Sequence, residues 1–178
     1  ETGHHPYPAK FDKQQSLIEL HSFEVGQATQ TAGRLMRFRK MGKLAFAHIQ
    51  DHTGQLQIIF KRDVLGDESF AEATKLLDLG DFVGVSGEIF VTQKGEQSIM
   101  VKQWTFLGKA ILPLPEKFHG LKDRETLYRQ RYLDLVSNQE TMQRFVFRSN
   151  FIRAIREFYW QEGFFEAVSY THLRAHET

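Results

Sequence analysis

Cysteine is absent from the 178 residues of this chain. A chain without thiols has neither a disulfide nor a thiolate ligand for a metal ion, so disulfide scaffolds and cysteine-based zinc sites are excluded. The eight histidines are scattered, with no carboxylate at ligand spacing around them. The sequence therefore predicts no metal site, and the lack of cysteine is consistent with a reducing compartment.

Long apolar runs are missing as well. No run approaches the roughly 18 residues that a membrane-spanning helix needs, and the residues before Pro8 contain no apolar core of a signal peptide. The sequence also has no glycine-rich phosphate loop of the P-loop type. We therefore expect a soluble cytoplasmic protein without a membrane partner.

Apolar side chains are nevertheless abundant, at 41% of the chain with sixteen phenylalanines, which is enough for a packed core. Short strand-like runs separated by glycine turns predict five strands: 25–38, 44–50, 55–61, 82–91 and 97–107. We expect a bulge or bend at Gly33. A helical pattern over 67–77 falls between the third and fourth strands, which is the layout of an OB-fold barrel.

The flanks of this barrel predict the domain organisation. We expect a mainly β protein with appended helices, divided into an N-terminal extension (1–23), an OB-fold domain (24–107), a linker (108–122) and a helical segment (123–166). The extension is expected to hold a short helix over 13–20, and the linker contains Pro113 and Pro115.

The helical segment carries its own start and stop signals. Asp123 is expected to cap a helix that holds Tyr128 and Tyr132, and Ser137–Glu140 matches a capping box for the next helix. Gly163 is expected to end that helix. An apolar stripe runs along it, formed by Phe147, Phe151, Ala154, Ile155 and Phe158.

The net charge of +1 indicates no partner, but charge is unevenly distributed. Residues 63–81 hold six acidic residues and one lysine. Residues 25–50 hold five basic residues and no acidic ones: Arg34, Arg37, Arg39, Lys40 and Lys43. This basic edge would favour phosphates, with binding that weakens as salt rises. A solvated surface loop can show the same clustering.

The hairpin over 44–61 predicts a binding surface. A tight turn pairs His48 with Gln57 and makes Phe46 a diagonal neighbour of Gln57, both on the outer, exposed face. An exposed ring can stack on an unpaired base, and an amide can donate to and accept from a base edge. The alternative is that Phe46 packs under the preceding loop as part of the core.

Several short runs along the chain are recognisable as motifs. They are Gly33–Met36, Met41–Phe46, Gln50–Gln57, Gly80–Gly87, Lys94–Ser98 and Leu112–Leu121. The most specific run is Tyr128-Arg129-Gln130-Arg131-Tyr132-Leu133-Asp134-Leu135. With these runs the chain resembles the class IIb lysyl-tRNA synthetases over roughly residues 6–166. It resembles the anticodon-binding barrel of this family and the opening of its catalytic domain, up to the motif 1 helix.

The resemblance implies roles for individual residues. In the family, the phenylalanine that matches Phe46 stacks on an anticodon base, the glutamine that matches Gln57 reads the central uridine, and the arginine that matches Arg39 supports it. Glu96 would lie near an outer anticodon base. The motif 1 helix forms the homodimer interface, so Phe147, Phe151, Ile155 and Phe158 would face a second subunit; packing on their own domain is the alternative.

The resemblance also implies the activity of the full-length protein, which would bind ATP, magnesium and lysine and charge tRNA(Lys). After Glu166 the match ends, and we expect residues 167–178 to be a non-native tail. Motifs 2 and 3 lie beyond this point in the family, so no catalytic residue is assigned and this piece is expected to be inactive alone.

Two other interpretations remain open. An aspartyl- or asparaginyl-tRNA synthetase would share the barrel and the phenylalanine–glutamine pair, because those anticodons also carry a central uridine. A stand-alone OB module that binds single strands would explain the basic edge. The second interpretation does not explain the linker or the helix over 141–162.

Overall fold

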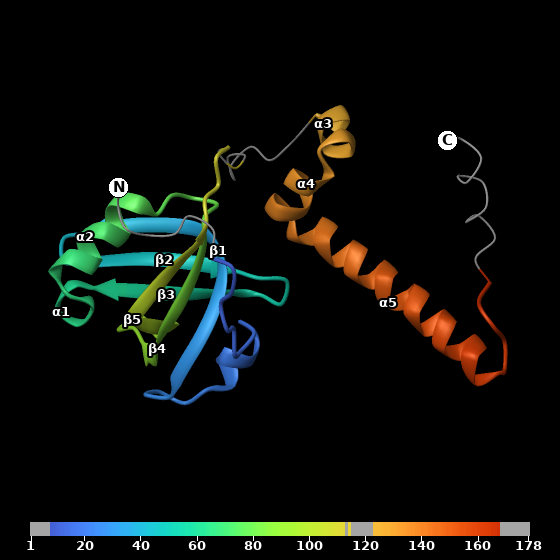
Figure 1. Cartoon of the computed structure of the whole chain (residues 1–178), viewed down its shortest axis with the longest axis horizontal. Helices are drawn as coiled ribbons and strands as arrows, with labels where there is room; N and C mark the ends of the chain where they lie inside the picture. The colour runs from blue at the N-terminus through green and yellow to red at the C-terminus, as the bar shows by residue number, and fades with distance from the viewer. Residues whose placement is uncertain (1–7, 113, 115–122, 168–178) are drawn as a thin grey trace. The chain divides into compact units, whose positions relative to one another are not determined.

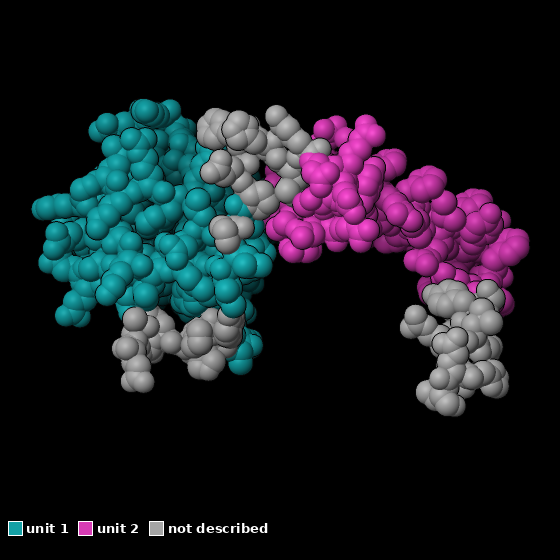
Figure 2. Space-filling view, turned by 90° about the horizontal axis from the view of Figure 1, so that it is seen from above, with its two compact units in different colours: residues 1–114 teal, residues 115–178 magenta. Residues whose placement is uncertain are grey.

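The computed structural model describes residues 8–112, 114 and 123–167. The chain divides into two compact units, residues 1–114 and 115–178, shown in teal and magenta in Figure 2. Most of the expected linker (108–122) and all but the first residue of the expected tail (167–178) lie outside the described residues. The described part of the first unit is built mainly of strands, and that of the second is built of helices.

The first unit contains a closed barrel of five strands in the order β1-β2-β3-β5-β4 (Figure 1). The strands are β1 (Ala28–Met41), β2 (Leu44–Gln50), β3 (Gln55–Lys61), β4 (Phe82–Val91) and β5 (Gln97–Gly108). β3 pairs with β5 in parallel, and the other pairs are antiparallel. Helices α1 (Arg62–Leu65) and α2 (Asp67–Leu76) come between β3 and β4, so the predicted OB-fold layout is confirmed.

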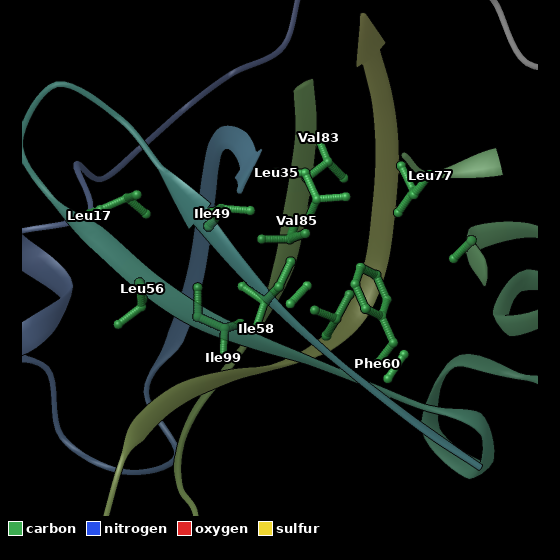
Figure 3. Packing of buried hydrophobic residues seen from close by; sticks show 14 of the residues in the cluster. Leu17, Leu35, Ile49, Leu56, Ile58, Phe60, Leu77, Val83, Val85 and Ile99 are labelled. Carbon is green, nitrogen blue, oxygen red and sulfur yellow. The ribbon is translucent and has the colours of Figure 1, made fainter. Parts of the chain in front are cut away.

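Alternate side chains of the strands fill the interior of this barrel. On β2 and β3 the buried set is the predicted one: Ala45, Ala47, Ile49, Leu56, Ile58 and Phe60. Figure 3 shows Ile49, Ile58 and Val85 close together inside the barrel. Phe70 and Ala73 of α2 join the same core. Phe46 and His48, which alternate with the buried residues of β2, lie on the outer wall of the barrel.

The segment before β1 is not the helix expected over residues 13–20. Only a short 3₁₀ helix, η1 (Glu19–Ser22), forms there. The preceding backbone is bonded to the barrel instead: the N–H of Gln14 donates to the Gln30 carbonyl at 3.1 Å, and the N–H of Leu17 donates to the Asp51 carboxylate at 3.0 Å. Because these groups find partners in the barrel, the segment does not need the hydrogen bonds of a helix.

The irregularity of β1 lies at a different residue from the one predicted. Leu35 pairs with Ile49 and Arg37 pairs with His48, so Met36 is the extra residue of a bulge. Gly33 pairs in regular register with Val83, so no bulge lies there, and of the two predicted alternatives the bulge at Gly33 is wrong. Glycine is needed at position 33 because the backbone of β2 comes close to it: a Cβ atom there would lie 2.9 Å from the carbonyl oxygen of Gln50.

The described part of the second unit consists of α3 (Arg124–Arg129), α4 (Arg131–Ser137) and α5 (Gln139–Gln161). Asp123 caps α3 as predicted, accepting from the N–H groups of Glu125 and Thr126. The helical pattern that follows is broken at Gln130, where ψ is 54°. The residues expected in one helix therefore form two.

Asn138 caps α5, and the predicted capping box starting at Ser137 is wrong. The Asn138 side chain accepts from the N–H groups of Glu140 and Thr141 at 3.1 and 3.4 Å. Ser137 is the last residue of α4, where its hydroxyl donates to the Leu133 carbonyl at 2.6 Å. The break between the two helices is one residue later than a capping box at Ser137 would require.

The C-terminal end of α5 is closed as expected by Gly163, whose φ is 81°. The N–H of Gly163 donates to the Trp160 carbonyl at 3.1 Å, and the N–H of Phe164 donates to the Tyr159 carbonyl at 3.0 Å. These two bonds form a Schellman motif. The rings of Tyr159 and Phe164 lie 5.5 Å apart and supply the hydrophobic contact that accompanies it.

Candidate nucleic-acid interface

Two rows of paired residues cross the outer wall of the barrel. In the first row Arg39 of β1 pairs with Phe46 of β2, and Phe46 pairs with Ile59 of β3. The second row comprises Arg37, His48, Gln57 and Ser98, from β1, β2, β3 and β5 in turn. The residues between these rows on β2 and β3 belong to the core. The predicted pairing of His48 with Gln57 is therefore confirmed, and Phe46 is the diagonal neighbour of Gln57.

Gln57 lies on the outer wall as predicted, but the prediction that it is exposed there is wrong. Only 8% of its surface reaches solvent. Its amide nitrogen donates to the Glu96 carboxylate at 2.7 Å, and its amide oxygen accepts from the Ser98 hydroxyl at 2.8 Å. Neighbours from the β4–β5 turn and from β5 cover the amide, because the parallel pairing of β3 with β5 brings them alongside.

Glu96 reaches this amide from the turn between β4 and β5. The turn is closed by a hydrogen bond from the Thr92 N–H to the Glu96 carbonyl, at 2.9 Å. The second carboxylate oxygen of Glu96 lies 3.3 Å from Nε2 of His48. Half of the Glu96 side chain is exposed. The structure thus places Glu96, His48 and Gln57 in one hydrogen-bonded group on the outer wall.

Phe46 is half-buried on this wall, and Arg39 beside it is exposed. Ile59, the other neighbour of Phe46 in the row, is buried. One part of the ring is therefore available to a ligand, while another part packs on the wall. A base that stacks on the available part of the ring would have the Gln57 amide on one side and the Arg39 guanidinium on the other.

The five residues of the basic edge do not form one cluster. The side chains of Arg37, Arg39 and Lys43 are exposed and make no hydrogen bond or ion pair with a described residue. Lys40 points toward α2, with its ammonium 3.3 Å from the Thr74 hydroxyl. Its neighbour Arg39 lies on the outer wall, so alternation along β1 directs Lys40 to the opposite face, where it reaches α2.

Arg34 lies nearer the middle of β1, and its side chain is bound by groups of the barrel. Its guanidinium donates to the Gly80 carbonyl at 3.2 Å and lies 4.2 Å from the centre of the Phe82 ring. Burial lowers the pKa of Arg34 from its ordinary value. Two of the four predicted phosphate contacts, Arg37 and Lys43, are therefore free to reach a ligand, as is Arg39, and the other two are engaged within the barrel.

The Ser98 contact was missed by the reasoning from sequence. Ser98 is fully buried and lies between the Gln57 amide and the β4–β5 turn. Its position follows from the parallel pairing of β3 with β5, which brings together residues 41 positions apart in the chain. The period of two along β5 places Ser98 on one face of that strand, but no local pattern fixes the register of a parallel pair.

The apolar stripe of α5 is exposed in this chain. Phe147, Phe151, Ile155 and Phe158 all present much of their surface to solvent. The rings of Phe147 and Phe151 stack at 6.3 Å between centroids. The stripe is therefore a continuous apolar surface without cover from the described residues.

Residues 8–112, 114 and 123–167 include no group of three or more histidine, aspartate or glutamate side chains able to hold a metal ion. Among the described helices, none is both long enough and apolar enough to span a bilayer.

Each of the two units is similar to a known family of protein domains. Residues 30–107 match the family model described as OB-fold nucleic acid binding domain. Residues 123–169 match the model described as tRNA synthetases class II (D, K and N). The order of the two matches along the chain is the order predicted from the sequence.

Individual relatives are similar along most of the chain. A lysine–tRNA ligase of Lactococcus lactis is 47% identical over 176 residues, which cover 93% of this chain and 35% of that protein. The lysine–tRNA ligase of Streptococcus thermophilus is 53% identical, covering 83% of this chain and 29% of that protein. Lysine–tRNA ligase 2 of Methanosarcina acetivorans is 45% identical, covering 92% and 33%.

This chain spans about a third of the length of these curated relatives. Within that third it carries an OB-fold barrel followed by the start of a class II synthetase domain. The identity of 45 to 53% extends through both. Over both units the chain is therefore similar to the lysine–tRNA ligases.

Proposed function

We propose that this chain is the anticodon-binding part of a lysine–tRNA ligase and that it binds the anticodon loop of tRNA(Lys). One observation carries the proposal: an aromatic ring with an available face, Phe46, is the diagonal neighbour of a hydrogen-bonding amide, Gln57, on the outer wall of the barrel. The choice of lysine and of its tRNA in this proposal rests on the names of the relatives, which are lysine–tRNA ligases.

The binding mode follows from the two rows. An unstacked base lies against Phe46, which contributes about 1–3 kcal/mol per base. The Gln57 amide contacts the hydrogen-bonding edge of that base and reads the central uridine. Arg39, the cross-strand neighbour of Phe46, supports the base from the other side. Glu96 contacts Gln57 and is open to solvent on its other side, so it borders the site of an outer anticodon base.

Phosphates of the loop are bound by cations that make no hydrogen bond or ion pair with another described residue. Arg37 and Lys43 are exposed and make no hydrogen bond or ion pair with a described residue, and they lie on β1 and in the β1–β2 turn. Arg34 and Lys40 contribute less, because each already donates to a group of the barrel. Affinity is therefore expected to fall as salt concentration rises.

The test is a titration of the chain with anticodon stem-loop RNAs. The loop of tRNA(Lys) is expected to bind more tightly than the same loop with its central uridine replaced. Equal affinities for the two loops would count against the proposal. Tighter binding of the loops of tRNA(Asp) or tRNA(Asn), which share the central uridine, would point to the sister synthetases instead.

Two variants separate stacking from edge recognition. Phe46→Ala is expected to lose about 1–3 kcal/mol of binding free energy for every loop, because every base has a face to stack. Gln57→Leu is expected to lower discrimination at one position and to leave the salt dependence unchanged. Uniform weakening by Gln57→Leu, without a change in discrimination, would contradict its role.

The longer protein is proposed to activate lysine with ATP and magnesium and to charge tRNA(Lys) in the cytoplasm. The described residues supply the RNA-binding part of this activity and no metal-binding group. The stripe of α5 is proposed to form a homodimer interface, since Phe147, Phe151, Ile155 and Phe158 are exposed along one helix. Sedimentation of the longer protein, with and without Phe151→Ser, tests this: the variant is expected to shift toward monomer.

A further inference from the structure

The carboxamide of a glutamine has one donating end and one accepting end, and it can turn by half a rotation. If both orientations are open, the same side chain can pair with either uracil or cytosine, because the two bases present opposite donor and acceptor patterns. A glutamine that selects one of them needs a neighbour that fixes its orientation. The surroundings of Gln57 contain such a neighbour.

We propose that Glu96 is a positioning residue that fixes the orientation of the Gln57 amide, so that the site accepts uridine and rejects cytidine. This inference rests on the proposed function and extends it to a residue that acts through Gln57. It assigns the choice between the two pyrimidines to a carboxylate of the β4–β5 turn, and not to the glutamine alone.

The argument starts from the chemistry at each end of the amide. Nε2 of Gln57 donates to the Glu96 carboxylate at 2.7 Å. An ionised carboxylate only accepts hydrogen bonds. The reversed amide would place its oxygen against the carboxylate oxygen, losing a charge-assisted hydrogen bond and adding a repulsion. Glu96 therefore permits one orientation of Gln57.

Ser98 does not make this choice. Its hydroxyl donates to Oε1 of Gln57 at 2.8 Å and lies 3.3 Å from the Glu96 carbonyl oxygen. A hydroxyl can rotate, so Ser98 could donate to the Glu96 carbonyl and accept from a reversed amide. It satisfies either orientation, and the carboxylate of Glu96 decides between them.

The remaining groups of the amide then face a ligand in a fixed order. With one N–H bonded to Glu96 and one lone pair of the oxygen bonded to Ser98, one N–H and one lone pair of Gln57 are left. A uracil edge offers a ring N–H beside a carbonyl oxygen, which complements them. A cytosine edge offers a ring nitrogen acceptor beside an amino group, and it would fit only the reversed amide.

Glu96 is itself held in place. Its backbone N–H donates to the Thr92 hydroxyl at 3.1 Å, and its carbonyl accepts from the Thr92 N–H at 2.9 Å. Its second carboxylate oxygen lies 3.3 Å from His48 Nε2. A carboxylate restrained at its backbone and at its far oxygen can impose its orientation on the amide, which is itself nearly enclosed.

The experiment compares stem-loops that carry uridine or cytidine at the central anticodon position, titrated into the full chain. Glu96→Gln keeps the shape of the side chain but can either donate or accept, so it removes the preference for one amide orientation. We expect its affinity for the cytidine loop to rise and the ratio of the two affinities to fall by about tenfold, which is the order of one good bidentate base contact.

Glu88→Gln is the matched control. It removes the same charge from β4, where Glu88 forms an ion pair with Lys102 and not a hydrogen bond with Gln57. Loss of a negative charge raises affinity for all RNA, so both variants are expected to bind both loops somewhat more tightly. The ratio of the two loops is expected to change only in Glu96→Gln. Because both loops are titrated into the same sample, an unfolded fraction does not alter the ratio.

Three results would be decisive. An unchanged ratio in Glu96→Gln, with the parent selecting uridine, overturns the role of Glu96 and leaves the proposed function standing. A parent that does not select uridine overturns the proposed function itself. Ser98→Ala is expected to keep the preference for uridine, so loss of the preference in Ser98→Ala but not in Glu96→Gln would assign the choice to the hydroxyl and overturn the proposal.

Discussion

The barrel and the helical unit treat their apolar side chains in opposite ways. Phe60 of the barrel is 0% exposed, whereas Phe147 of α5 is 71% exposed. The barrel closes its sheet into a ring and covers its interior from all sides. Within the described part of the second unit, nothing covers the stripe of α5. A helix of 23 residues with this surface depends on a partner surface for its stability.

The two units therefore differ in whether they need another surface in order to fold. The barrel contains its own core and is expected to fold and bind RNA by itself. The helical unit carries apolar side chains that complete a core only when another surface is added.

The largest expected effect comes from the interior of the barrel. Phe60→Ala removes a fully buried ring and is expected to lower the free energy of unfolding by about 3–5 kcal/mol, because the core cannot collapse into the cavity. Urea unfolding followed by the fluorescence of Trp104 measures this in a Trp160→Phe background, where Trp104 is the only tryptophan.

Phe151→Ala is the counterpart in α5. It is expected to change the unfolding of the barrel by less than about 0.5 kcal/mol, since the ring is exposed on the other unit. A loss in Phe151→Ala as large as that in Phe60→Ala would show that the barrel depends on the helix, and the division into a self-sufficient unit and a dependent one would be wrong.

The second effect concerns a buried carboxylate. Burial by itself raises the pKa of Asp51, but hydrogen bonds from Lys13, Thr53 and the Leu17 N–H outweigh it and hold the pKa well below its usual range. A carboxylate with a lowered pKa in the folded state stabilises above its unfolded pKa of about 4, and this stabilisation is lost as the pH falls toward the folded pKa.

Asp51→Asn is therefore expected to cost about 1.5–3 kcal/mol of unfolding free energy at pH 7, the range for hydrogen bonds to a charged group. Its stability is also expected to fall less steeply than that of the parent below about pH 4. Urea unfolding at a series of pH values measures both. Glu140→Gln, which breaks an exposed pair with Arg144 on α5, is expected to change little at any pH. If the free energy of unfolding fell equally steeply below about pH 4 in Asp51→Asn and in the parent, this account would be contradicted.

The barrel was largely predictable because its signals are local. The alternation Ala45, Ala47, Ile49 against Phe46 and His48 gives the face of each residue, and the hairpin turn gives the register. The same reasoning placed Phe46 and Gln57 on one wall. Local signals also gave the Asp123 cap and the Gly163 end of α5.

What could not be predicted depends on distant contacts. The low exposure of Gln57 comes from Glu96 and Ser98, which the parallel pairing of β3 with β5 brings to it. The segment before β1 lacks the expected helix because Asp51 and Gln30 bind its backbone. The one-residue shift of the α5 cap from Ser137 to Asn138 is of the size by which helix boundaries commonly differ.

A smaller effect is expected at the end of α5. Gly163→Ala places a side chain at a φ of 81° and is expected to destabilise the Schellman motif by about 1–2 kcal/mol. The ring contact between Tyr159 and Phe164 would be lost first. Fluorescence of Trp160 and amide exchange at Phe164 report this end, while unfolding of the barrel is expected to be unchanged. Unaltered exchange at Phe164 would mean that the motif does not hold the helix end.

The smallest effect distinguishes two neighbouring residues at the start of α5. Asn138→Ala removes the side chain that accepts from the N–H groups of Glu140 and Thr141, and is expected to cost about 1 kcal/mol of helix stability. Ser137→Ala removes only a bond to the Leu133 carbonyl within α4 and is expected to cost less. Circular dichroism at 222 nm, followed through thermal unfolding, measures both. A larger loss in Ser137→Ala would restore the capping box to Ser137. No described residue covers the apolar stripe of α5, so the stability of this helix depends more on such end contacts than does that of the barrel. The difference between the two variants is therefore expected to be smaller when a partner surface covers the stripe.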